Sequence, residues 1–309
     1  MAIASTSRTR VAYIAETTNG TTPATPTFLE IRRTGGEMLT KKTTVVSDEI
    51  RLDRNVRDEY QVAQDVDGQY DFELTYGTFD DLLAGALFGS WTTNVLTNSS
   101  VEQSFTFEET VDLGSGSFAY SRFTGVDVDS LALNFPARKG VTGSMKLMGK
   151  QQSLATAIIS GATYTAPNTN VPETSVSVAS LSIAGLSPVP KIKNLSLNIA
   201  NNLRIRDIVG SLYADSFGSG QIDVTGSFDA YFESNALYQA VLDHGGGAIS
   251  LTVGAVTDKK YTINMPVVRF LDGARRLGGK NDDVMINVPF RAIYDSGISG
   301  SIRITRAVA

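Results

Sequence analysis

The stretch QIDVTGSFDAYFE at 221–233 decides the fold, because a close counterpart, DVDGQYDFELTY, occupies 65–76. In both segments apolar or small residues alternate with polar ones, which is the period-two pattern of a β-strand with one buried and one wet face. The motif V-x-G inside them occurs a third time in GVTGSMKLMG at 140–149. The pattern predicts a mainly β chain that uses one type of strand at several places.

A duplication of the chain explains the repetition. An offset of 158 residues aligns Val66 with Val224 and continues into the segment after each strand. A further echo links LALN at 131–134 with LSLN at 195–198. Because strand, following helix and further strand recur in the same order, we interpret the chain as two copies of one unit.

Each strand of the 158-residue repeat is followed by a segment with helical periodicity. Apolar residues over 79–87 fall at i, i+3, i+4, i+7 and i+8, which is the stripe of a short amphipathic helix. Thr78 with Asp81 resembles its N-terminal cap. The equivalent helix is expected to start at 234–235 and to end at the glycines 245–247.

The composition is that of a globular β protein. The 309 residues are 42% hydrophobic, with 28 glycines and nine prolines, which is typical of short strands joined by turns. The chain has no cysteine, so disulfides and thiolate metal sites are excluded. Its net charge of -5 argues against a protein whose main task is to bind nucleic acid. Because no signal peptide or membrane span is recognisable, we expect synthesis in the cytoplasm and no membrane partner.

Two polar segments organise the chain. Residues 15–27 are rich in Thr and Pro and predict an irregular N-terminal arm. A second such run, 160–175, makes the natural linker. We therefore predict two domains, 1–172 with the arm and linker, and 173–309.

A long charged connection precedes each strand of the 158-residue repeat, at 46–64 and at 201–220. Loops of this length in a compact domain usually have a function or are disordered. Both carry arginines, and these are candidate contact residues: Arg51, Arg54, Arg57, Arg204 and Arg206.

Three segments carry a resemblance to a known family. SDEIRLDR at 47–54, the strand and helix of 66–91, and FTGVDVDSLALNFPARKGVTGSMKLMG at 123–149 together resemble the major tail tube proteins of long, non-contractile-tailed (siphovirus-type) bacteriophages. The resemblance implies two tandem tail-tube-type β-sandwich or barrel domains, each with a short flanking α-helix. It also implies a structural virion protein that assembles into stacked rings and conducts DNA. In such a stack the arginines of the two charged connections are candidates for contacts between rings.

The expected partners follow from this resemblance. Family members usually form hexameric rings from single domains, so two domains favour a trimer with pseudo-sixfold symmetry over a hexamer. The other partners are further tail proteins, namely tape measure, terminator and distal tail proteins, and DNA passes through the lumen without specific binding. In a closed ring one sheet face looks inward, and the acids on the wet strand faces are candidates for it: Asp65, Asp67, Asp71, Glu73, Asp223, Asp229 and Glu233.

Other functions have weaker support in the sequence. No enzyme, cofactor or metal site is expected, because His244 is the single histidine and GARRLGGK at 273–280 lacks the Ser or Thr of a phosphate-binding loop. The adjacent acids at 80–81 and 282–283 have no calcium-loop spacing. Two alternatives remain: a two-domain binding module, such as an adhesin or glycan-binding sandwich, and the tube subunit of a contractile secretion system.

Overall fold

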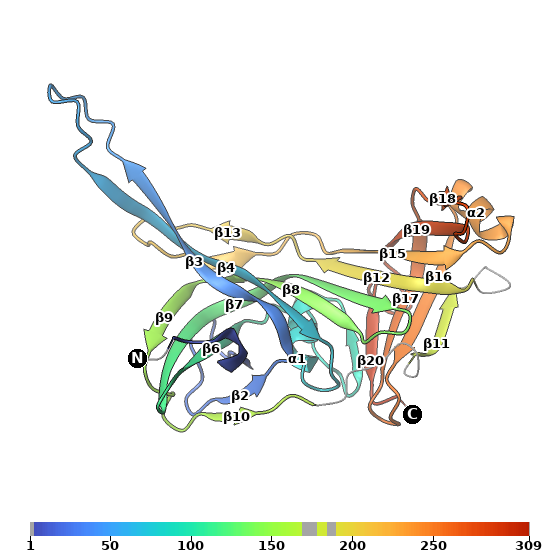
Figure 1. Cartoon of the computed structure of the whole chain (residues 1–309), viewed down its shortest axis with the longest axis horizontal. Coiled ribbons are helices and arrows are strands. Elements are labelled where there is room, and N and C mark those ends of the chain that lie inside the picture. Colours follow the sequence, from blue (N-terminus) through green and yellow to red (C-terminus); the bar gives the residue numbers. More distant parts are fainter. Residues whose placement is uncertain (1–2, 169–177, 184–189, 309) are drawn as a thin grey trace.

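The computed structural model describes residues 3–168, 178–183 and 190–308, and it confirms the prediction of a mainly β chain (Figure 1). The elements up to residue 168 are the 3-10 turn Thr6–Arg8, β1 (Thr9–Ala15), β2 (Thr27–Glu30), β3 (Arg33–Val46), β4 (Glu59–Glu73), α1 (Asp80–Ala86), β5 (Val95–Thr97), β6 (Phe105–Gly114), β7 (Ser117–Pro136), β8 (Thr142–Gly149), β9 (Gln151–Ala155) and β10 (Thr163–Thr165). Those after it are β11 (Val178–Ile183), β12 (Ile192–Ala200), β13 (Arg204–Arg206), β14 (Ser216–Gly218), β15 (Asp223–Tyr231), α2 (Asn235–Leu242), β16 (Gly246–Val253), β17 (Tyr261–Phe270), β18 (Ala274–Arg276), β19 (Met285–Ala292) and β20 (Arg303–Arg306). Neither α-helix in these residues has the length and apolar character that a membrane span requires.

The two halves repeat one strand order. In the first half the antiparallel neighbours run β3-β4-β8-β7-β6-β1. In the second half they run β12-β15-β19-β17-β16-β11. In each half the helix follows the second strand of this order, as the 158-residue offset predicts. The division at 172/173 lies outside the described residues and stays a prediction.

The halves share one sheet. β7 has 20 residues, and its second part lies between β8 and β12, so the first half continues into the second without a break in hydrogen bonding (Figure 1). The echo of LALN and LSLN in the sequence falls on this junction, where Leu133 lies directly opposite Leu197. Apolar side chains of both strands enter one continuous core.

The glycine of each V-x-G motif marks a close approach of neighbouring strands. A Cβ atom on Gly68 would lie 2.3 Å from the carbonyl oxygen of Glu37, and one on Gly226 would lie 2.4 Å from that of Ser196. The third glycine, Gly143, has the ring of Phe72 over it in the same way. The motif therefore serves packing: valine fills the core, and glycine lets an adjacent strand approach the backbone at all three sites and an aromatic ring approach it at Gly143 and Gly226.

Replacing Gly226 by Ala is expected to lower the free energy of unfolding by about 1–3 kcal/mol, because the new methyl group overlaps the Phe290 ring and a strand backbone. Urea denaturation measures the change. Thr225→Ala, one residue earlier on the wet face, is the matched control and should alter stability by less than about 0.5 kcal/mol. Equal stability of the two variants would contradict this account of the motif.

Helix ends and the linker differ in detail from expectation. The stripe over 79–87 is buried as predicted. However, α1 starts at Asp80 with Phe79 at its N-cap position and no side-chain cap. The Thr78 hydroxyl accepts a hydrogen bond from the backbone amide of Asn168. Ser234 does cap α2. That helix ends at Leu242, before the predicted glycines.

Residue His244 takes the left-handed conformation that a glycine was expected to supply, with a φ of 49°. The glycines that follow enter β16 instead. The segment 16–26 is irregular, as predicted. Part of the predicted linker, however, is β10, which pairs with β2 in parallel, and the rest from residue 169 to 175 lies outside the described residues.

Candidate assembly surfaces

The shared sheet presents one polar face opposite the core. Residues directly opposite one another on neighbouring strands point to the same side of a sheet, and one row can be followed across six strands from β4 to β19: Asp71, Ser144, Ala132, Asn198, Thr225 and Arg291. The middle of this row consists of small neutral side chains. The row carries charge at its two ends, Asp71 and Arg291.

The acids predicted to face a lumen follow two strands of this polar face. Asp65, Asp67, Asp71 and Glu73 lie on β4, Asp223 and Asp229 lie on β15, and Glu233 follows β15. None of these residues is buried. The structure therefore brings both groups of acids onto one sheet, separated by β8, β7 and β12.

Four of these acids form ion pairs that sequence reasoning missed, because the partners lie on neighbouring strands or loops. Listed from the first strand onward, the pairs are Lys41–Asp67 at 2.6 Å, Arg32–Glu73 at 2.7 Å, Arg291–Asp223 at 3.0 Å and Lys191–Glu233. Asp71 and Asp229 instead accept hydrogen bonds from Gln69 and Asn287, both at 2.8 Å. The face is thus less negative than the sequence indicates.

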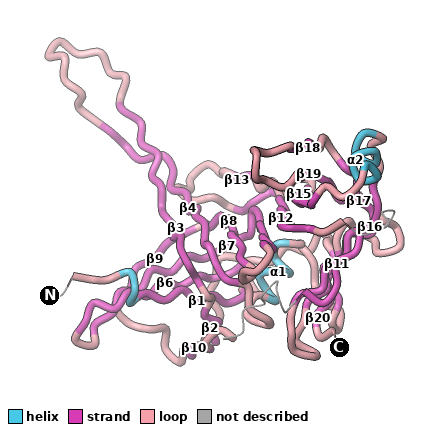
Figure 2. Tube along the Cα trace, turned by 45° about the vertical axis from the view of Figure 1, so that its right-hand side comes forward, coloured by secondary structure: helices cyan, strands magenta, loops and turns pink. Residues whose placement is uncertain are grey.

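The β3–β4 hairpin forms an arm that projects from the body (Figures 1 and 2). Its tip, residues 47–58, is closed by a hydrogen bond from the Ser47 amide to the Asp58 carbonyl at 3.0 Å. Three apolar side chains of the tip stand in solvent: Ile50, Leu52 and Val56 are 98%, 105% and 72% exposed. These side chains make no use of the protein's own core, which makes the tip a candidate contact surface.

Two of the three predicted arginines of the arm tip form ion pairs within the tip. Arg57 bonds Asp53 at 2.6 Å and Arg51 bonds Glu49 at 3.0 Å. The hydrogen bond from Arg57, with others from the loop, holds the pKa of Asp53 below its ordinary value. Arg54 lies in the left-handed conformation, with a φ of 58°. The tip therefore offers apolar side chains, and the charges of Glu49, Arg51, Asp53 and Arg57 are paired within it.

The second charged connection lies against the base of the arm. Its two short strands, β13 and β14, form a small hairpin, and the Leu212 carbonyl accepts a hydrogen bond from the Gln64 amide at 2.7 Å. Arg204 and Arg206 are exposed on this hairpin. Within the described residues, no hydrogen bond or ion pair joins this hairpin to the arm tip, so the two sets of predicted arginines remain apart.

A polar clamp joins the C-terminal strand to the first half. β20 pairs with β5, and the carboxylate of Asp80 accepts hydrogen bonds from the Tyr261 hydroxyl and, at 2.5 Å, from Arg306. The Arg306 guanidinium also lies 4.4 Å from the ring centre of Trp91. Burial and then the Asp80 charge raise the pKa of Tyr261 well above its ordinary value, so the hydroxyl stays a donor. The clamp and the β7–β12 ladder together hold the halves at one angle.

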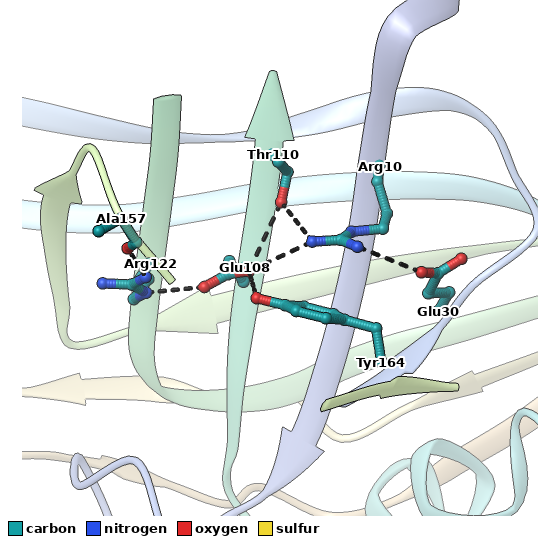
Figure 3. A network of polar contacts seen from close by, with 7 residues as sticks. All are labelled: Arg10, Glu30, Glu108, Thr110, Arg122, Ala157 and Tyr164. Atoms are coloured by element: carbon teal, nitrogen blue, oxygen red, sulfur yellow. Dashed lines mark hydrogen bonds and ion pairs between the residues drawn. The ribbon is translucent and has the colours of Figure 1, made fainter. Parts of the chain in front are cut away.

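A buried ionic network fixes β10 on the first half (Figure 3). The side chain of Glu108 is fully buried and accepts a hydrogen bond from Arg122 at 2.7 Å and from the Tyr164 hydroxyl at 2.5 Å. Arg10 stacks on the Tyr164 ring, 3.6 Å from its centre, and bonds Glu30. Burial and then the hydrogen bond to Glu108 raise the pKa of Tyr164. Sequence reasoning missed this network.

The remaining groups considered in the sequence, such as His244 and the basic segment 273–280, belong to helix ends and strands. His244 follows α2, and 274–276 of the basic segment form β18. Burial and then Asp80 raise the pKa of Asp81. A search of the described residues for three or more His, Cys, Asp or Glu side chains that could hold a metal finds no such group.

The comparisons with known proteins identify one family. A family model described as phage tail tube protein matches residues 6–292. None of the curated proteins compared with the chain matches it. The match includes both halves of the sheet, the arm and α1 and α2.

Proposed function

Because the chain belongs to the phage tail tube protein family, we propose that it self-assembles into stacked rings and forms a conduit for phage DNA. Membership makes it a structural component of the virion tail. The observation that carries the proposal is the repeated strand order of the two halves, joined by β7 and β12. A chain with two equivalent units and an open sheet edge on each can add copies head to tail until the ring closes.

The ring consists of three chains with pseudo-sixfold symmetry. Each chain supplies two successive units, so three copies present six units around the axis. The clamp at Asp80 supports this arrangement, because it fixes the angle between the units of one chain. Tape measure, terminator and distal tail proteins are the further partners of this assembly.

The polar face of the shared sheet lines the channel. Phosphate contacts from Lys and Arg supply most non-specific DNA affinity. On this face four acids are paired with cations, and Asp71 and Asp229 make only hydrogen bonds to neutral amides. Small neutral side chains together with these carboxylates favour sliding over binding.

Negative-stain microscopy of the purified chain tests the proposal, with mass measurement of any rings. Rings or tubes with three chains per ring are expected. Six chains per ring would overturn the trimer. A monomer that never forms rings at high concentration but binds glycans would overturn the tube and favour a two-domain binding module.

Replacing Asp71 and Asp229 by Lys is expected to leave tube assembly intact and to slow genome ejection at low salt, because six new cations per ring would contact phosphates. Added salt should relieve the delay, since screening shortens the range of these contacts. The Asp71→Asn, Asp229→Asn pair is the matched control and should eject at a nearly normal rate. Ejection of the Lys variant at the normal rate at low salt would show that this face does not line the channel.

A further inference from the structure

The junction between the halves offers a template for the contact between chains. β12 lies antiparallel beside β7, with Leu197 opposite Leu133. The counterparts of these strands are β3 at one end of the shared sheet and β17 with its continuation β18 at the other. Among the described strands, β3 pairs only with β4 and β18 only with β19. We infer that residues 35–41 of β3 of one chain pair antiparallel with residues 272–278 of a second copy in the register of the β12–β7 junction, an inference that rests on the proposed ring.

The correspondence of β3 with β12 is set by the V-x-G glycines. Met38 lies opposite Gly68, and Leu197 lies opposite Gly226. Equating these pairs gives an offset of 159 residues between β3 and β12. The same offset superimposes the irregularity of each ladder, between Arg33 and Gly35 and between Ile192 and Asn194.

The correspondence of β7 with β17 and β18 follows through the next strands. Gly68 lies opposite Leu147, which lies opposite Val128; Gly226 lies opposite Phe290, which lies opposite Phe270. Val128 and Phe270 are therefore equivalent, with an offset of 142 residues. After an irregularity in both ladders, the same offset carries Ala132 onto Ala274.

Transferring the junction register with these two offsets gives a defined set of pairs between chains. Ala132 opposite Asn198 becomes Ala274 opposite Leu39 of the neighbour. The two adjacent pairs on the same polar face are Glu37 with Arg276 and Lys41 with Asp272. Both join opposite charges, although charge played no part in deriving the register. Opposite charges directly across an antiparallel pair stabilise it.

The residues that would pair on the polar face of these two edge strands are exposed in the single chain, as expected for a contact that only a second chain completes. Glu37, Leu39, Asp272 and all three residues of β18 are exposed, and neither Glu37 nor Arg276 forms an ion pair within the described residues. Leu277 is 65% exposed and would lie opposite Gly36, which leaves room for it. An open edge of this kind is a template for adding a strand from another chain.

Engineered cysteines test the register, because the chain has none of its own. The full chain with Leu39→Cys and Ala274→Cys should form disulfide-linked dimers and trimers on oxidation. Ala132→Cys with Asn198→Cys is the matched control at the template junction and should form a disulfide within one chain. Leu39→Cys with Arg276→Cys displaces the pair by two residues, and we expect at least about tenfold less crosslinking, since its Cβ atoms lie beyond disulfide reach.

The outcomes separate this inference from the proposed function. Rings that form without a disulfide between positions 39 and 274, while the control pair at 132 and 198 does form its disulfide, would overturn the register. The proposed tube would not be affected by that result. Stronger crosslinking of the displaced pair would overturn the register as well. A chain that never forms rings would remove the proposed function itself.

Charge reversal tests, without relying on disulfide geometry, whether Glu37 and Arg276 meet between chains. Glu37→Arg alone and Arg276→Glu alone each set like charges opposite one another, and each should raise the concentration needed for ring formation about tenfold or more. The double variant restores opposite charges and should return assembly to nearly the original concentration. Additive defects in the double variant would show that the two residues do not meet.

Discussion

A chain carrying Glu108→Ala is expected to lose about 3–5 kcal/mol of unfolding free energy, because the substitution leaves buried cations without their counter-ion. Arg122, with 13% of its side chain exposed, would keep the Ala157 carbonyl and the Tyr120 ring as partners but would lose its carboxylate. Tyr164 would lose the acceptor of its hydroxyl. Urea denaturation of the full chain measures the loss.

The loss of stability is expected for a buried ion pair such as that of Glu108 and not for an exposed one. Asp112 lies on the same strand, β6, and pairs with Arg8 at 2.5 Å, but Arg8 is 52% exposed. Asp112→Ala is therefore the matched control and should change stability little, because exposed ion pairs are screened by water and salt. A Glu108→Ala chain as stable as this control would contradict the importance of the network.

Loss of the network should also release β10. That strand is held to β2 by three residues in parallel pairing and by the stacking of Tyr164 on Phe28. The stacking depends on where the Tyr164 side chain is held, and the hydrogen bond to Glu108 fixes that position. Hydrogen exchange at 163–165 should accelerate in Glu108→Ala before exchange in the core strands does.

Removing the arm tip is expected to abolish tubes while leaving rings. Residues 48–57 can be replaced by Asn-Gly, because Ser47 and Asp58 are already hydrogen bonded and Asn-Gly suits a two-residue hairpin turn. We propose that the tip contacts the adjacent ring. The truncated chain should melt normally and form rings in negative-stain images, with few stacked tubes. Tubes of normal length would reject the proposal.

Two milder variants separate apolar from ionic contacts at the tip. Ile50, Leu52 and Val56 together replaced by Ser should raise the concentration needed for tube formation by about 100-fold or more, since burying each such side chain contributes about 1.5–3 kcal/mol. Arg51, Arg54 and Arg57 replaced by Gln should have the smaller effect, because Arg51 and Arg57 are already paired within the tip. A larger effect of the Gln variant than of the Ser variant would show that the arginines, and not the apolar side chains, make the contact.

Much of the fold could be predicted from the sequence because it is written in local patterns. Period-two alternation located β4 and β15 and distinguished their buried faces from their wet faces. The apolar stripe located α1, and Ser234 marked the start of α2. Exact helix ends were harder to predict. Thr78, the expected cap, instead accepts a hydrogen bond from Asn168, which is 90 residues away.

The candidate surfaces were predicted only in part. The acids of the two V-x-G strands do lie on one sheet, yet their ion pairs join residues such as Lys41 and Asp67, whose proximity depends on strand register. The arginines of the arm were visible in the sequence, but the exposed Ile50, Leu52 and Val56 were not, because apolar residues in a loop carry no periodic signal. The burial of Glu108 was missed for the same reason: a strand pattern does not say which element covers its polar side.

The sequence by itself determined the secondary-structure class, the repetition of a strand-and-helix pattern and the side of each repeated strand that faces the core, because alternation and composition act over neighbouring residues. Only the tertiary structure decided which strands are neighbours: that β7 carries β12 on its free edge, that β20 returns to β5, and that Glu108 is sealed beneath Tyr164. These contacts join residues 56 to more than 200 positions apart. Their energies depend on how the whole core packs, which no local stretch of the chain encodes.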